Sequence, residues 1–349
     1  MKSLCVLLFT FIASVAGGAM PDFSLPGVEI ENEHLDNSRC ASGFMFRRFA
    51  DVDRKDARVP ADYNGGHWGH IALRYAHTPR LDVLRGCYEK DGTSAHFGIT
   101  PDGRIICFVN PDCAVSYLLG QSGFGGKNMF NYWAVTVHLL TPGSRAAPQA
   151  FEVFGVPQQV PGDPNFWYVY PPAQLDAAAG LICGLQARYG IPGCNVLGQS
   201  DLRPGGAIDP GPMFDWFGIY SRFSAGFHPG FFPSALTDIE EGRYVAAEAC
   251  RVMTEETSVR VIMALGYEGS GPNIVRAYKF HFLQDELSPD VTDPLKLQLL
   301  WHVYKLNELQ CGGERFGSSW SALISSKPEL PQVMVKLDAL VRRGEASSE

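Results

Sequence analysis

A short apolar stretch followed by a rigid proline–glycine turn constrains the fold of this chain more than any other segment. Residues 195–198 (Asn-Val-Leu-Gly) have the composition of a short strand, and Gln199-Ser200-Asp201 follows directly. The motif Asp209-Pro210-Gly211-Pro212 comes soon after. This order places the side chains at positions 199 and 209 on one rim of a cleft beside the end of a strand. An imidazole and a carboxylate placed there would suit zinc, but position 199 is Gln.

Other segments predict a sheet covered by helices. The runs 71–75 and 133–139 are apolar and β-branched enough to be strands. Residues 96–99 and 105–110 flank a hairpin turn. Apolar residues at helical spacing predict an amphipathic helix over 173–189. Because strands and helices alternate, we expect an α/β fold with a mixed central β-sheet flanked by helices.

The C-terminal part of the chain predicts a small three-helix domain. A stretch rich in Gly, Pro and Phe precedes it, and Asp293-Pro294 is a good start for its third helix. We therefore divide the chain into a signal peptide, an N-terminal extension, the α/β domain, a linker, the helical domain and a tail. Their predicted bounds are 1–19, 20–65, 66–225, 226–235, 236–311 and 312–349.

The N-terminal residues predict export. Lys2 precedes an apolar run from Leu4 to Ala16, and small residues follow as far as Ala19, which is typical of a secretory signal peptide. The alternative is a membrane anchor, but the run is short for a transmembrane span and no later stretch is apolar enough to cross a bilayer. We expect a protein that is secreted or kept in the periplasm or cell envelope.

The number of cysteines and the net charge indicate whether disulfide bonds and nucleic-acid binding are to be expected. Nine cysteines less Cys5 of the signal leave eight, an even number that favours disulfide bonds in an exported chain. The candidate pairs nearest in sequence are Cys107 with Cys113 and Cys183 with Cys194, and buried free thiols are the alternative. Hydrophobic residues make up 46% of the chain, which indicates a folded core. A net charge of −8 argues against general nucleic-acid binding.

Several motifs carry a resemblance to a known family. Gln199-Ser200-Asp201 and the segment 209–216 (Asp-Pro-Gly-Pro-Met-Phe-Asp-Trp) resemble the type-2 N-acetylmuramoyl-L-alanine amidases, which share a fold with peptidoglycan recognition proteins. Segments 93–99 and 101–105 are similar to the family's Ser-Ala-His-Phe strand and Asp-Gly-Arg hairpin. The resemblance covers roughly 65–225, and a weaker one to a helical peptidoglycan-binding module extends to about 310. It implies action on, or binding of, peptidoglycan or muropeptides.

The resemblance also locates the catalytic positions of the family. Two His and one Asp would hold zinc, a Glu would orient the attacking water, and a Lys would stabilise the oxyanion. These positions fall on Arg74, Gln199, Asp209, His138 and Ala207. Tyr117 lies in a changed cleft segment and Asn131 matches a family position, so both are further binding-cleft candidates.

The substitutions predict a pseudoenzyme. A guanidinium has no lone pair for a metal, and a Gln carbonyl is a weaker zinc ligand than imidazole. Without zinc, amide hydrolysis loses both its Lewis acid and its activated water. We therefore expect no catalytic residue to be intact and no cofactor to be bound. We also expect Arg74 to pair with Asp209, because a buried carboxylate is costly without a cation.

Two alternatives remain. In the first, the protein is an active amidase with a rewired zinc site built from Asp209, His138 and His77. In the second, it is a host-facing or protein-binding protein whose aromatic stretch 223–232 forms an interface. His67, His70, His281 and His302 are expected to be structural or surface residues. His96 is expected to point inward and bond to the backbone.

Overall fold

The computed structural model describes residues 19–222 and 253–308, apart from 41–44, 53–58, 62, 64 and 145–150, together with positions 247, 250, 251, 325, 332, 335 and 339. Almost all of the predicted signal peptide and tail, the whole predicted linker, the aromatic stretch 223–232 and Cys311 lie outside the described residues.

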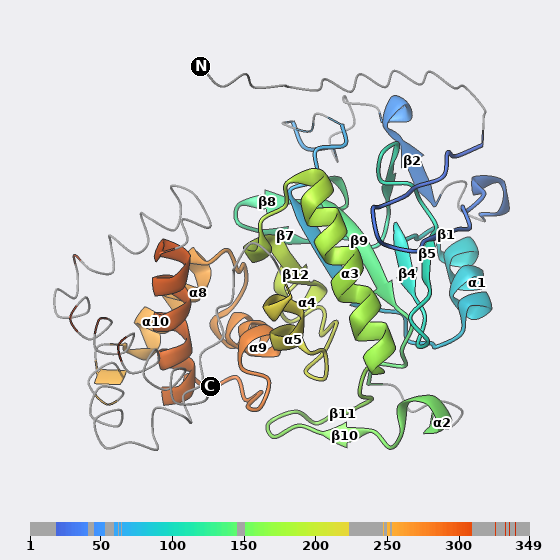
Figure 1. The fold of residues 1–349 in the computed structure, drawn as a ribbon. Helices are drawn as coiled ribbons and strands as arrows, with labels where there is room; N and C mark the ends of the chain where they lie inside the picture. Colours follow the sequence, from blue (N-terminus) through green and yellow to red (C-terminus); the bar gives the residue numbers. More distant parts are fainter. Residues whose placement is uncertain are drawn as a thin grey trace.

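A six-stranded mixed sheet forms the centre of the fold (Figure 1). Its strands in spatial order are β1 (Glu31–Asn32), β5 (Ile105–Cys107), β4 (Phe97–Ile99), β9 (Ala134–Leu139), β3 (His70–Tyr75) and β12 (Val196–Gly198). Neighbouring strands are parallel except β4 and β5, which form the expected antiparallel hairpin. The sheet and its flanking helices confirm the α/β fold.

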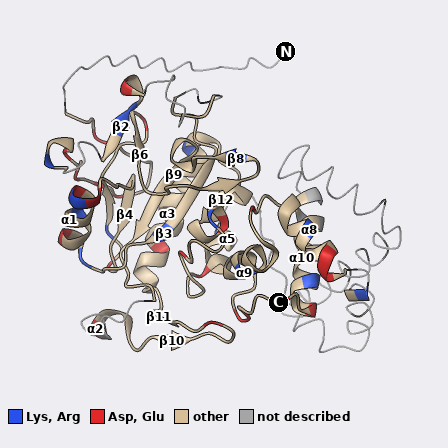
Figure 2. Ribbon diagram, turned by 180° about the vertical axis from the view of Figure 1, so that it is seen from behind, with Lys and Arg blue, Asp and Glu red and all other residues tan. Residues whose placement is uncertain are grey.

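The two faces of β3 pack against different helices. Ile71 and Leu73 share a core with α3 (Pro172–Tyr189), which crosses the sheet in Figure 1. Ala72 belongs to a second core that includes residues of α1 (Leu81–Asp91). Successive side chains of a strand point to opposite faces, so a strand buried on both sides reads as a continuous apolar run. The exposed face of α1 carries acidic and basic residues side by side (Figure 2).

Helix α3 has clear signals at both ends. Pro172 occupies the first turn, where its missing N–H is not needed, and Gly190 ends the helix in a left-handed conformation with φ of 68°. The helix therefore matches the predicted span of 173–189 almost residue for residue.

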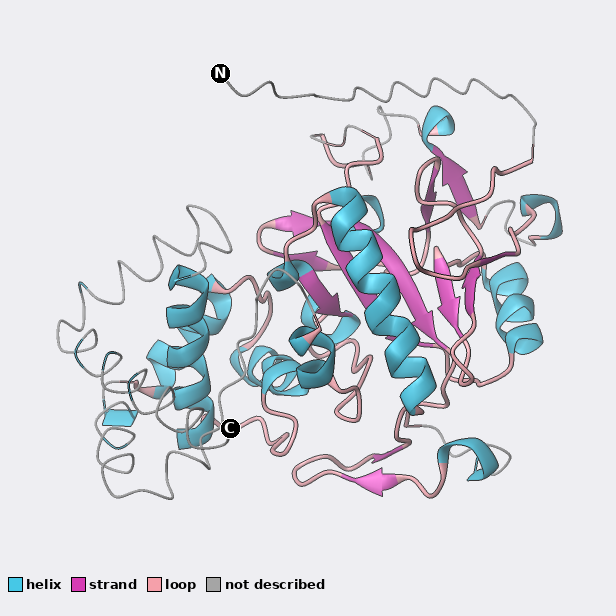
Figure 3. Cartoon of the chain, viewed as in Figure 1, coloured by secondary structure: helices cyan, strands magenta, loops and turns pink. Residues whose placement is uncertain are grey.

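Shorter elements connect the main ones (Figure 3). Three two-stranded ribbons pair β2 (Phe46–Arg48) with β6 (Ala114–Ser116), β7 (Gly123–Phe124) with β8 (Lys127–Asn128), and β10 (Gln158–Gln159) with β11 (Phe166–Trp167). The short α-helices are α2 (Phe151–Phe154), α4 (Gln199–Leu202) and α5 (Trp216–Ser221). The 3-10 helices span Asn37–Arg39, Phe49–Asp51, Phe130–Tyr132 and Gly193–Asn195.

The N-terminal extension is part of the main fold. Strand β1 forms one edge of the sheet by pairing with β5. The ring of Phe23 is only 1% exposed and its centroid lies 5.3 Å from that of Phe97. The extension is thus packed onto the α/β domain, because its apolar side chains enter the core of that domain.

In the described part of the C-terminal module, three helices are α8 (Glu255–Ala264), α9 (Gly271–Phe282) and α10 (Asp293–Glu308). The third begins at Asp293 as predicted. The module packs beside α4 and α5, away from α1 (Figure 1). Lys279 of α9 is fully buried, and its ammonium donates hydrogen bonds to Glu286 and to the carbonyl of Asp290. The loop between α9 and α10 is therefore tied to α9 itself.

The structure bears on two expectations that follow from export. Among the described cysteines no disulfide bond is present, so neither candidate pair is joined. Cys113 instead donates to the carbonyl of Asn110, and Cys183 donates to that of Arg222. Within the part of the chain that the structure describes, no helix combines the length and the apolarity needed to cross a membrane.

Candidate functional site

A pocket of about 300 Å³ lies at the carboxyl ends of β3 and β12. Ligands of open α/β sheets commonly bind at this edge. The pocket is lined by Arg74, Tyr75, His77, Leu118, Leu119, Gly120, Ser144, Gln199, Arg203, Gly206, Ala207, Ile208 and Asp209. The chain therefore brings together five of the predicted positions, Arg74, His77, Gln199, Ala207 and Asp209.

Arg74 and Asp209 form an ion pair in this pocket. Arg74 Nε lies 3.8 Å from Asp209 Oδ1, and Arg74 Nη1 donates to the carbonyl of Leu118 over 3.3 Å. The backbone N–H of Tyr75 donates to Asp209 Oδ1 over 3.2 Å. The Asp209 side chain is 7% exposed and that of Arg74 is 26% exposed. The charge pairing expected from the sequence is present.

Burial governs the acidity of Asp209. Loss of water raises the pKa of its carboxyl to about 6, and the nearby Arg74 charge and the Tyr75 hydrogen bond oppose that rise. The carboxylate is thus held ionised at neutral pH chiefly by groups of the pocket itself.

The loop that carries Asp209 is fixed on both sides. The Ser200 N–H donates to the Asp209 carbonyl over 2.9 Å, and the Tyr170 hydroxyl donates to the Pro210 carbonyl over 2.7 Å. A Cβ atom at Gly198 would lie 2.7 Å from Pro210 Cδ, so the close approach of β12 to the loop requires glycine. The sequence motif around 209 therefore sets the position of one carboxylate.

His138 lies in the core beside the pocket. It pairs in register with Arg74 on the neighbouring strand β3. Its Nδ1 shares a hydrogen bond of 2.6 Å with the Tyr88 hydroxyl, and the two rings are stacked. Burial, followed by the Arg74 charge, lowers the pKa of His138 well below its usual value. The ring is neutral, and its buried Nε2 makes no hydrogen bond.

Neither Asn131 nor Tyr117 lines the pocket. Asn131 Oδ1 accepts from the N–H groups of Leu118 and Leu119 at 3.1 and 2.8 Å, so it shapes the wall that those two residues form. Tyr117 does not line the pocket; its backbone N–H donates to Ser94 Oγ.

Arg203 is the pocket residue whose role the sequence reading missed. It is not among the candidates selected from the sequence, and it lines the pocket as a second guanidinium. It lies close to Gly206, where a Cβ atom would stand 2.8 Å from Arg203 Nε. The sequence signal that could have identified Arg203 is a basic residue a few positions after strand β12.

Asp201 links the pocket region to the C-terminal module. Its Oδ2 accepts from the Gly198 N–H and from His281 Nδ1, both at 2.7 Å, and its Oδ1 accepts from the Tyr267 hydroxyl over 2.7 Å. His281 Nε2 in turn bonds to the Tyr220 hydroxyl over 2.7 Å. Both Asp201 and His281 are buried. His281 is therefore structural, as expected, and it fastens α9 to α4.

The described residues include no group of three His, Cys, Asp or Glu side chains placed to hold a metal ion. The rewired set of His77, His138 and Asp209 is accordingly not assembled as a ligand group. His138 is bonded to Tyr88, and Asp209 faces a guanidinium.

Comparisons with known proteins agree with this geometry. The model of the N-acetylmuramoyl-L-alanine amidase family matches residues 67–212. AmiD from E. coli, solved with anhydro-N-acetylmuramic acid-L-Ala-D-gamma-Glu-L-Lys, aligns with a TM-score of 0.55 at 18% identity over 72% of this chain and 94% of its own. AmpDh3 from Pseudomonas aeruginosa aligns with a TM-score of 0.54 at 19% identity over 74% and 97%.

Both solved structures are similar to this chain in fold. No curated protein matches the chain in sequence. The family match covers residues 67–212, and the motifs around positions 96, 199 and 209 and the mixed central sheet agree with a domain of the N-acetylmuramoyl-L-alanine amidase type in that part of the chain.

Proposed function

We propose that this protein binds the peptide part of muropeptides or peptidoglycan in the pocket at the ends of β3 and β12, without zinc-dependent hydrolysis. One observation carries the proposal: Arg74, at the first metal-ligand position of the family, forms an ion pair with Asp209, the one family ligand that the chain keeps.

The donor set of the pocket does not fit zinc. A guanidinium has no lone pair to give, and its charge repels a dication at this place. Gln199 offers an amide oxygen where imidazole would be preferred, and the family's Lys position is Ala207. No hydrolytic step is therefore assigned to the pocket.

The same residues suit a carboxylate ligand. Arg74 and Arg203 both line the pocket, and guanidinium groups bind carboxylates through paired hydrogen bonds. Arg74 Nε is buried and makes no hydrogen bond within the protein. The fragment bound to AmiD includes a D-gamma-Glu and a terminal Lys, which carry free carboxylates. A pocket of about 300 Å³ accepts such a peptide end.

Titration calorimetry with anhydro-N-acetylmuramyl-L-Ala-D-γ-Glu-L-Lys tests the proposal. We expect saturable binding, recovery of the intact fragment, and binding weakened about tenfold in Arg203→Gln because one charged contact is lost. Arg80→Gln removes an exposed guanidinium outside the pocket and serves as the matched control. Release of free peptide by the zinc-supplied protein, or no binding at millimolar fragment, contradicts the proposal.

A rewired zinc amidase is the second candidate function. The buried Nε2 of His138, which has no hydrogen-bond partner, favours it, since this atom offers a lone pair to a metal when Nδ1 donates its proton to the Tyr88 hydroxyl. If this candidate holds, added zinc restores cleavage of sacculi and His138→Ala abolishes it. A third candidate, a protein-binding role away from peptidoglycan, predicts no retention on purified sacculi.

We further propose that residues 1–19 direct export, so that the mature protein is secreted or stays in the periplasm or envelope. Cell fractionation, with N-terminal sequencing of the mature chain, tests this. A full-length chain in the cytoplasm contradicts it.

A further inference from the structure

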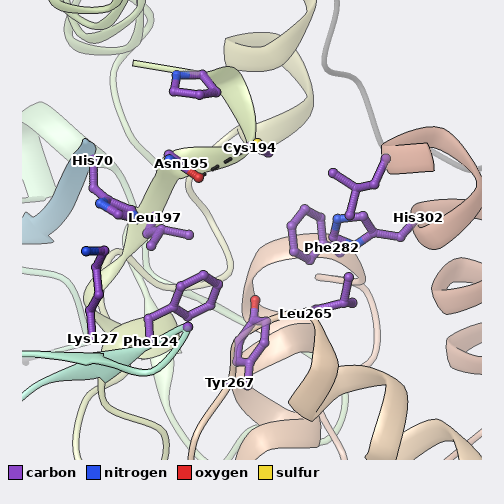
Figure 4. A pocket seen from close by; sticks show the side chains of 13 residues that line it. His70, Phe124, Lys127, Cys194, Asn195, Leu197, Leu265, Tyr267, Phe282 and His302 are labelled. Atoms are coloured by element: carbon purple, nitrogen blue, oxygen red, sulfur yellow. Dashed lines mark hydrogen bonds between the residues drawn. The ribbon is translucent and has the colours of Figure 1, made fainter. Parts of the chain in front are cut away.

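A second pocket, of about 380 Å³, lies between the α/β domain and the C-terminal module (Figure 4). Its lining includes His70, the first residue of β3, and Leu197 of β12. The pocket described above lies at the other end of the same strands. Five residue steps along β3 separate the two ends, roughly 15 Å at the rise of a strand. The two pockets are therefore separate sites.

One wall of this pocket is apolar. Leu265 precedes the turn into α9, Phe282 ends α9, and Leu306 belongs to α10. Phe124 of β7 and Leu197 add apolar surface from the α/β domain. Figure 4 shows Leu265 and Phe282 facing the side from which His70 and Lys127 come. Such a wall stabilises the aliphatic or aromatic body of a small molecule.

The opposite wall is polar and positively charged. Lys127 of β8 extends toward the His70 ring in Figure 4, and its Nζ lies 3.9 Å from the centre of the Trp133 ring. Among the described lining residues Lys127 is the only formally charged side chain, and none is acidic. The pocket therefore favours a ligand with one negative charge.

His70 supplies a hydrogen-bonding atom without a partner. Its Nδ1 is buried and makes no hydrogen bond. Burial, with the nearby Lys127 charge, lowers the pKa of His70 to about 4, so the ring is neutral at physiological pH. A neutral imidazole can donate from Nδ1 to a carboxylate oxygen. Two further polar lining groups are engaged within the protein, since Asn195 donates to the Gly69 carbonyl and His302 bonds to Tyr278.

We propose that this interface pocket binds a small amphiphilic monocarboxylate, with its carboxylate on Lys127 and His70 Nδ1 and its apolar body against Phe282, Leu265 and Leu306. The ligand contacts both the α/β domain and the C-terminal module. It therefore stabilises their association as well as occupying the cavity. This site is independent of the muropeptide pocket.

Calorimetry on the full chain with octanoate and with 4-phenylbutanoate tests the proposal, and octanamide is the neutral analogue. We expect at least one carboxylate to bind with a dissociation constant of about 1 mM or tighter, and octanamide to bind at least tenfold more weakly than octanoate. A carboxylate that binds should also raise the melting temperature. The muropeptide should not compete with either carboxylate.

Two variants locate the carboxylate. Lys127→Met keeps the apolar stem against Trp133 and should weaken binding about tenfold, and His70→Phe should weaken it less. Lys90→Met, which removes an exposed lysine on α1, is the matched control and should leave binding unchanged. Octanamide binding as tightly as octanoate, unchanged binding in folded Lys127→Met, or no binding of either carboxylate at 10 mM overturns the proposal. The comparison with octanamide uses the unaltered chain and decides the question even if a variant fails to fold.

Discussion

The guanidinium of Arg74 and the carboxylate of Asp209 lie 3.8 Å apart, from Nε to Oδ1, where the end of β3 meets the Asp-Pro-Gly-Pro loop. Asp209 is buried, and an isolated buried carboxylate would be strongly destabilising. The pair explains how a buried carboxylate is tolerated at the end of β3. The guanidinium of Arg74 is also a permanent cation beside Asp209 that needs no metal.

Replacing Arg74 by Ala should lower the free energy of unfolding by about 2 kcal/mol, because it leaves Asp209 buried without its cation. Denaturant unfolding at pH 7 measures the change. Arg80→Ala, which breaks an exposed pair with Asp82, is the control and should leave the unfolding midpoint unchanged. Equal stability of Arg74→Ala and the unaltered protein would show that the pair does not hold the pocket together.

The stability contributed by Asp209 should fall as pH rises. Its folded-state pKa, about 6, is above the ordinary value of 3.8 for Asp, so the folded protein binds more protons than the unfolded chain between those values. Asp209→Asn removes this dependence. Between pH 4 and pH 7, the free energy of unfolding of the unaltered protein should therefore fall by roughly 2 kcal/mol relative to that of Asp209→Asn. A difference that is constant over this range contradicts the assignment.

Buried neutral histidines should have the opposite effect. Burial lowers the pKa of His96 and of His302 to about 3, and that of His138 falls as well. Their contribution is fully present above pH 6.5 and is lost as pH falls toward those folded-state values, because the unfolded chain takes up the protons. Unfolding midpoints measured between pH 7 and pH 4 should fall, and less steeply in His302→Gln. An identical slope in that variant would contradict the burial of a neutral ring.

Removing His281 should loosen the C-terminal module. His281→Ala leaves the buried Asp201 carboxylate without one of its donors, at a cost of about 2 kcal/mol. Limited proteolysis should then cut the module faster, while His281→Gln, which keeps a donor, should be affected less. His67→Ala, at an exposed histidine, is the control and gives the baseline rate of proteolysis. Identical cleavage rates in all three variants would contradict a docking role for the Asp201–His281 bond.

The local sequence pattern correctly predicted those helices and strands whose formation depends on residues close together in the chain. The strands β3 and β9, the β4–β5 hairpin and the start of α10 all follow from apolar period, turn residues or a Pro after Asp. The inward His96 was also predicted correctly, since its Nε2 bonds to the Ala114 carbonyl. The pairing of Arg74 with Asp209 followed from the resemblance together with the rule that buried charges need partners.

Contacts between segments far apart in the sequence could not be predicted from the local sequence pattern. The Tyr88–His138 hydrogen bond joins α1 to β9, and the Asp201–His281 bond joins residues 80 positions apart. Strand β1 consists of Glu31 and Asn32, whose types do not favour a strand, and it exists because β5 offers an open edge. The disulfide expectation rested on an even number of cysteines, which carries no information on which thiols approach each other.

Zinc content of the purified protein after dialysis against trace zinc tests the central claim most directly. A guanidinium at position 74 and an amide at position 199 predict a zinc content far below one ion per chain. Near one zinc per chain, lost on Asp209→Asn or His138→Ala, would contradict the claim and restore the zinc amidase as the function of this pocket.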